Sequence, residues 1–131
     1  MPMTEADSDK AYATASDAIQ NRIKARVGPK CSVFFSAYKF DSDKVPIDNL
    51  DDVPITGRVI IKGIRDRSRG QLSKDYESPI MESPTWLDLC AIANDQIVVT
   101  RDRVHRYLEN VEVVGNTADI QIAVFRLGGV N

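Results

Sequence analysis

The order of helical and strand-like patterns along the chain constrains its fold most. Apolar residues recur at intervals of three and four from Ser8 to Val27, which predicts an amphipathic helix. Ser8 is the expected N-cap, and Gly28-Pro29 is a strong helix stop. This segment is the best-defined helix that the sequence predicts.

A second helix is expected to open at Ser83-Pro84, with the serine as N-cap and the proline as first helical residue. Its predicted end lies at Gln96 or Val99. The residues expected on its inner face are Leu87, Cys90, Ala91, Asn94 and Val98, with Trp86 near the start.

Each predicted helix is followed by two strand-like segments. The first pair is Cys31–Phe40, rich in aromatic and β-branched residues, and Thr56–Asp66. The second pair is Val104–Val114, with a bulge near Asn110, and the alternating segment Ala118–Leu127. Gly115-Asn116 is the expected turn between these last two strands.

The predicted fold class is therefore α+β, in the order helix-strand-strand-helix-strand-strand. Hairpin connections favour an antiparallel four-stranded sheet with both helices packed on one face. Residues 1–131 would form one domain, with a frayed tail at 1–6 and a long loop at 67–83. Ile23 and Ile122 are both expected to face the core.

Composition argues against a secreted, membrane-spanning or metal-binding protein. The formal charge is −2, and the acidic N-terminal residues lack the basic and apolar regions of a signal peptide, so a cytoplasmic location is expected. No apolar run is long enough to span a membrane. One histidine and two cysteines, Cys31 and Cys90, supply too few ligands for a structural metal site, and no cofactor motif is present. The cysteines are expected to be buried, reduced thiols.

One weak catalytic constellation is present near the start of the third predicted strand. Asp102 and His105 are spaced so that they can meet across a turn, which would orient the imidazole as a general base. Tyr107 would assist. The competing interpretation is a surface histidine beside an incidental carboxylate.

A basic loop supplies a possible anion site in Arg65, Arg67 and Arg69. If the first two strands were neighbours, these arginines would lie close to the basic end of the first helix. The loop lacks interleaved aromatic residues, so nucleic acid is a disfavoured ligand, and solvated surface charge is the competing interpretation. Tyr76 and Trp86 flank the long loop and would either line a small pocket or pack into the core.

These features favour a non-catalytic binding or assembly domain that forms a homo-oligomer through an open sheet face or edge. An unidentified protein or a small anionic ligand is a further potential partner. The two alternatives are a small enzyme that uses His105 as general base and an anion or nucleic-acid binder that uses the 65–69 loop.

Overall fold

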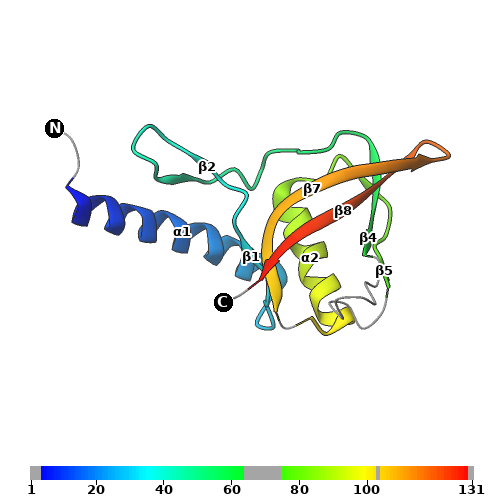
Figure 1. Ribbon diagram of the computed structural model, residues 1–131, viewed down its shortest axis with the longest axis horizontal. Helices are drawn as coiled ribbons and strands as arrows, with labels where there is room; N and C mark the ends of the chain where they lie inside the picture. Colours follow the sequence, from blue (N-terminus) through cyan, green and yellow to red (C-terminus); the bar gives the residue numbers. More distant parts are fainter. Residues whose placement is uncertain (1–3, 64–74, 103, 130–131) are drawn as a thin grey trace.

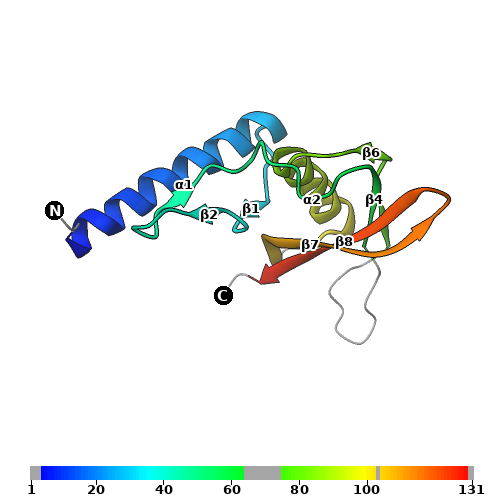
Figure 2. The same ribbon diagram turned by 90° about the horizontal axis from the view of Figure 1, so that it is seen from above.

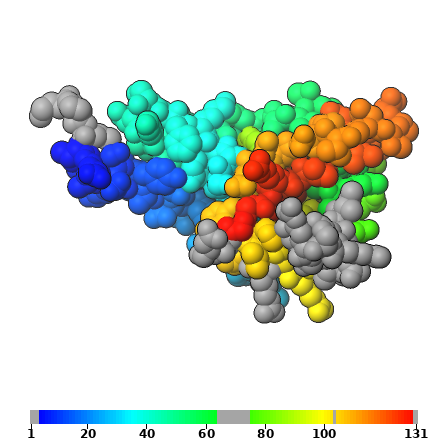
Figure 3. All heavy atoms as spheres, viewed as in Figure 1, coloured from blue at the N-terminus to red at the C-terminus, as the bar shows by residue number. Residues whose placement is uncertain are grey.

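The computed structural model describes residues 4–63, 75–102 and 104–129. Two helices and eight strands follow one another in the order α1, β1 to β6, α2, β7 and β8 within these residues (Figure 1). Neither helix is long and apolar enough to cross a membrane. The molecule is elongated, with α1 at one end and the tip of the β7–β8 hairpin at the other (Figure 3).

Helix α1 spans Glu5–Val27 and begins earlier than predicted, inside the expected tail. Its N-cap is Thr4 rather than Ser8, because the Thr4 Oγ1 atom accepts a hydrogen bond from the backbone N–H of Asp7 at 3.1 Å. Gly28 ends the helix as predicted, at a φ of 104° that favours glycine. The N-terminal half projects away from the sheet (Figures 1 and 2).

Helix α2 spans Trp86–Thr100 and also begins at a different cap from the predicted one. Thr85 and Asp88 form a capping box, in which each side chain accepts a hydrogen bond from the backbone N–H of the other residue. Predicted inner residue Val98 is instead 54% exposed. The buried residues are Trp86, Leu89, Cys90, Ala93, Asn94, Gln96, Ile97 and Thr100.

The sheet differs from the predicted four-stranded antiparallel one. It is a mixed sheet of six strands in the order β1-β7-β8-β4-β5, with β6 also paired to β4. The six strands are β1 (Phe34–Phe35), β4 (Arg58–Gly63), β5 (Tyr76–Glu77), β6 (Met81–Glu82), β7 (His105–Thr117) and β8 (Ile120–Gly129). A separate two-stranded sheet consists of β2 (Lys39–Phe40) and β3 (Pro46–Ile47).

The predicted pairing of the first two strands is wrong because the β7–β8 hairpin lies between them. β1 runs parallel to β7, and β4 runs parallel to β8. Segment 31–40 is not one strand, since its early N–H groups bond to a side chain: Asn94 Oδ1 accepts from Ser32 at 2.6 Å and from Val33 at 3.1 Å. The chain therefore contributes only Phe34–Phe35 to the large sheet.

The β7–β8 hairpin is confirmed, with its turn farther along than predicted. Ala118 and Asp119 have φ values of 47° and 67°, which form the tight turn, while Gly115-Asn116 remains within β7. The predicted bulge is present between Leu108 and Asn110.

The expectation that Ile122 faces the core is wrong. Its neighbour Ala123 is fully buried beside Ile61, so Ile122 and its partner Ile60 lie on the opposite face of the sheet. The core face is the one that carries Ile61 and Ala123. Both helices lie on that side of the sheet (Figure 2), where Ile23 of α1 and Leu89 of α2 belong to the same buried cluster. The expected long loop contains β5 and β6, and residues 64–74 lie outside the described part of the chain.

Candidate functional site

The predicted Asp102–His105 pair lies where α2 turns into β7. Arg101 adopts a left-handed conformation with a φ of 59° and caps the helix, and the Asp102 N–H donates to the Ile97 carbonyl at 3.1 Å. This cap directs the chain from the helix into the strand. Asp102 is therefore the first residue after the helix cap, at the start of the connection to β7.

Asp102 and His105 are in direct contact. The His105 Nδ1 atom lies 3.1 Å from Asp102 Oδ2, and the Asp102 side chain is only 4% exposed, against 25% for His105. Asp102 Oδ1 also accepts hydrogen bonds from the backbone N–H groups of Val104 at 2.9 Å and His105 at 3.0 Å. The carboxylate thus contacts the ring through Nδ1 and also accepts two backbone N–H groups of the same turn.

Tyr107 has a different environment from the one that the catalytic hypothesis needs. Its ring stacks on that of Phe34 with centroids 5.1 Å apart, and the Arg106 guanidinium lies 5.5 Å from the Phe34 centroid. These contacts connect β1 to β7. They give Tyr107 a packing role at the place where the two strands pair.

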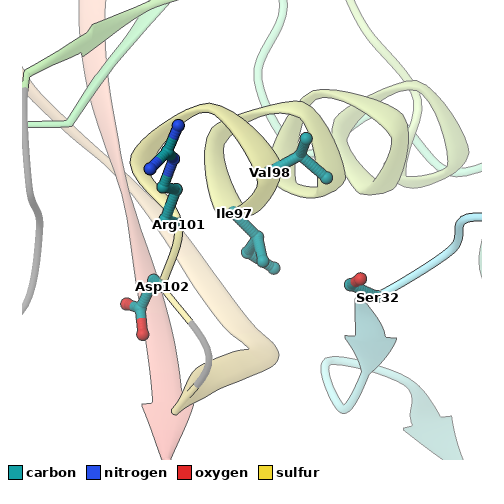
Figure 4. A pocket seen from close by; sticks show the side chains of 5 residues that line it. All are labelled: Ser32, Ile97, Val98, Arg101 and Asp102. Carbon is teal, nitrogen blue, oxygen red and sulfur yellow. The ribbon is translucent and has the colours of Figure 1, made fainter.

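A pocket of about 310 Å³ lies beside the Asp102 turn, lined by Ser32, Ile97, Val98, Arg101 and Asp102. Figure 4 shows Ser32 on the opposite wall from Arg101 and Asp102. The hydroxyl and the carboxylate therefore come from separate sides of the hollow. Ser32, Ile97 and Arg101 are the lining residues that the sequence patterns did not indicate.

Tyr76 and Trp86 are each buried against a different partner. The Tyr76 hydroxyl donates to Asp95 Oδ2 at 2.6 Å, and burial together with this carboxylate raises the pKa of Tyr76 well above its usual range. The Trp86 ring packs on Phe35 with centroids 5.5 Å apart. One ring therefore connects β5 to the third turn of α2, and the other fixes the start of α2 to the core.

The predicted basic end of the molecule depended on a strand pairing that does not exist. Arg65, Arg67 and Arg69 lie outside the described residues. Arg26 at the end of α1 forms an ion pair with Asp88 at 2.8 Å, which lowers the pKa of that carboxyl. The helix end is therefore tied to α2 through this ion pair.

The two cysteines are free thiols, as predicted. Cys90 is fully buried in the core, and its burial raises its pKa to about 12. Cys31 is only half-buried, in contrast to the expected full burial, and this partial burial raises its pKa as well. Both groups therefore remain protonated near neutral pH, which is the unreactive state of a thiol.

Exposed apolar side chains also occur on two further surfaces, one formed by α1 and β2 and the other by β7. The first surface includes Tyr12 and Phe40, and the second includes Val113 and Val114. The valine-rich sequence Val111-Glu-Val-Val114 could have indicated the second surface, since it contains no lysine or proline, which are residues that protect strand edges.

No group of three or more histidine, cysteine, aspartate or glutamate side chains that could hold a metal ion occurs among residues 4–63, 75–102 and 104–129. Comparison with known proteins gave no match to a family model, to a curated protein or to a solved structure. The functional argument therefore depends on the geometry of this chain.

Proposed function

We propose that this protein is a non-catalytic assembly module that associates with copies of itself. The observation that carries the proposal is the arrangement of one small core with two projecting ends, each of which exposes apolar side chains. Apolar groups that a chain does not bury itself favour burial against another protein.

The first projecting end is formed by α1 and the β2–β3 hairpin. Tyr12 and Phe40 are 40% and 51% exposed, and their rings stack with centroids 6.4 Å apart. Tyr38 packs edge-on against both rings. These aromatic side chains hold the helix to the hairpin and present part of their surface outward.

The second projecting end is the distal part of the β7–β8 hairpin. On one side of this part, β4 pairs with β8 from Gln121 to Ala123, directly after the turn, whereas β1 pairs with β7 only at Tyr107 and Leu108. The free edge of β7 therefore offers backbone N–H and C=O groups to another chain. Association with another copy would give β7 the strand contacts that the described residues of the chain provide only at Tyr107 and Leu108 on this side.

Sedimentation velocity over roughly 1 to 100 µM protein tests the proposal, because moderate self-association appears in this range of dissociation constants. We expect the weight-average mass to rise with concentration from that of the 14.6 kDa chain towards twice that value. A constant monomer mass over the whole range would contradict the proposal.

The Asp102–His105 contact supports a second candidate function, general-base catalysis through His105 Nε2. Hydrolysis of an activated ester, p-nitrophenyl acetate, measures the reactivity of this nitrogen. We expect His105→Gln to reduce the rate to the background that the remaining nucleophilic side chains of the protein give. Asp102→Asn keeps an oxygen for the two backbone N–H groups and should lower the rate less. A rate unchanged by His105→Gln would contradict this candidate.

A further inference from the structure

The two edges of the six-stranded sheet are built differently. On the outer side of β4, the two-residue strands β6 and β5 cover its beginning and its end. Between them, Ser78 exchanges two hydrogen bonds with the backbone of Ile61, both at 2.8 Å. The outermost strands, β5 and β6, have only two residues each, and Pro79 lies between them. Short edge strands and proline both disfavour pairing with another chain.

β7 forms the opposite edge, and most of it lacks a neighbour. β1 pairs with this strand only at Tyr107 and Leu108. Within the described ranges, no strand pairs with residues 109–117 on the side away from β8. Along such an edge, alternate backbone N–H and C=O groups point outward and can bond to an added strand.

The side chains of this open edge do little to prevent pairing. Residues 109–117 include no lysine, arginine or proline. Val113 and Val114 are 40% and 57% exposed, whereas Glu109 forms an ion pair with Arg126 at 3.6 Å. A regular run, Asn110–Val113, lies between two register shifts and offers a strand-like template.

We infer that two copies of this chain pair antiparallel along the 109–117 edge of β7, with Val113 facing Val113 of the second copy. Antiparallel pairing of identical edges requires a two-fold axis normal to the sheet. Such an axis keeps the same face of both copies on the same side, so the residue at the axis faces its own counterpart.

The limits of the open edge select Val113 as the central residue. β1 occupies the edge up to Leu108, and the hairpin turn begins at Ala118. Val113 has four residues on either side within these limits, so only this centre uses the whole open edge of both copies.

The charges of the edge agree with this register. A centre at Val113 places Glu112 opposite Val114 of the second copy, and Glu109 opposite Thr117. A centre at Glu112 would place two carboxylates side by side, which destabilises a strand pair. The register shift between Val113 and Gly115 is a bulge, which would increase the local twist of the two paired β7 strands.

Disulfide crosslinking tests the register and rests on the proposed self-association. Directly opposite residues in antiparallel strands have Cβ atoms about 5 Å apart, close to the range that a disulfide spans. We therefore expect Val113→Cys to form a covalent dimer with copper phenanthroline. Two controls should crosslink at least about tenfold more slowly: Val114→Cys at the neighbouring position and Val98→Cys on α2, where Val98 is 54% exposed, against 40% for Val113.

A charge substitution tests the energetic part of the inference. Val113→Lys places two ammonium groups opposite one another at the axis, and should weaken self-association about tenfold or more in sedimentation velocity. Val98→Lys is the matched control, since Val98 is 54% exposed and lies away from the edge. Circular dichroism of each variant verifies its fold.

The outcomes separate the inference from the function on which it rests. A monomeric wild-type protein overturns the proposed function and the inference together. Self-association that Val113→Lys leaves unchanged, with no selective crosslinking of Val113→Cys, overturns only the β7 edge as the interface. Crosslinking of Val114→Cys instead of Val113→Cys overturns the register.

Discussion

The two helices of this protein differ in how much of their surface the rest of the chain covers. α2 buries eight of its 15 residues, while α1 buries two of its 23, Ile19 and Ile23. Figure 1 shows α2 against the sheet and α1 extending away from it. A helix that buries few side chains gains little tertiary stabilisation.

This contrast indicates where the stability of the molecule lies. The core connects α2 and the last turns of α1 to the sheet, so disruption there should affect global unfolding. The first turns of α1 should open locally without unfolding the rest. The exposed half of α1 is therefore a surface that can be altered with little cost to the fold.

The largest effect is expected for Leu89→Ala in α2. Leu89 is fully buried, so the substitution leaves a cavity and should lower the free energy of unfolding by about 2 to 5 kcal/mol. Chemical denaturation followed by circular dichroism measures this change. Ile23→Ala in the packed part of α1 should fall in the same range; a loss below about 1 kcal/mol at either site would show that the helix does not pack as described.

A smaller effect is expected for Asn94→Ala. Its Oδ1 atom accepts the backbone N–H groups of Ser32 and Val33, and the substitution leaves both without this partner. We expect a loss of about 1 to 3 kcal/mol in the free energy of unfolding. Asn21→Ala on the exposed side of α1 is the control and should change stability little. Equal effects at the two sites would argue against a structural role for the Asn94 side chain.

The two N-caps provide a direct test of the contrast. Thr85 and Thr4 each accept a hydrogen bond of 3.1 Å from a backbone N–H. Thr85→Ala should cost about 1 kcal/mol because α2 unfolds with the core. Thr4→Ala should cost less than about 0.5 kcal/mol in global stability, since it frays only the projecting turns. Native-state hydrogen exchange would detect that fraying; similar global losses would mean that α1 unfolds as one unit with the core.

The smallest effect is expected from Tyr12 at alkaline pH. The hydrogen bond with Tyr38 raises the Tyr12 pKa to about 12, from 10.0. Because the folded pKa is raised, the stabilisation is present below pH 10 and is lost as the pH rises through 12. Exposure of Tyr12 keeps this contribution small. Tyr12→Phe should therefore lose less stability than wild type between these pH values, as measured by thermal unfolding; parallel losses would contradict the assignment.

Local features of the molecule were predictable to different degrees. The periodicity of the helices, the stop at Gly28 and the β7–β8 hairpin all follow from residues close together in the chain. The Asp102–His105 contact was predictable for the same reason, because a three-residue spacing brings the two side chains together across a turn. The caps were missed because Thr4 and Thr85 compete with nearby serines of similar capping preference.

The helices and the terminal hairpin were thus determined by the sequence alone, because hydrogen bonds and apolar faces within a short stretch decide them. The order of the strands was not, because it depends on contacts between distant segments. Asn94 of α2 binds the segment before β1, and the hairpin separates β1 from β4. Which edge of the sheet is left open follows from that order, so the proposed interface became visible only in the folded chain.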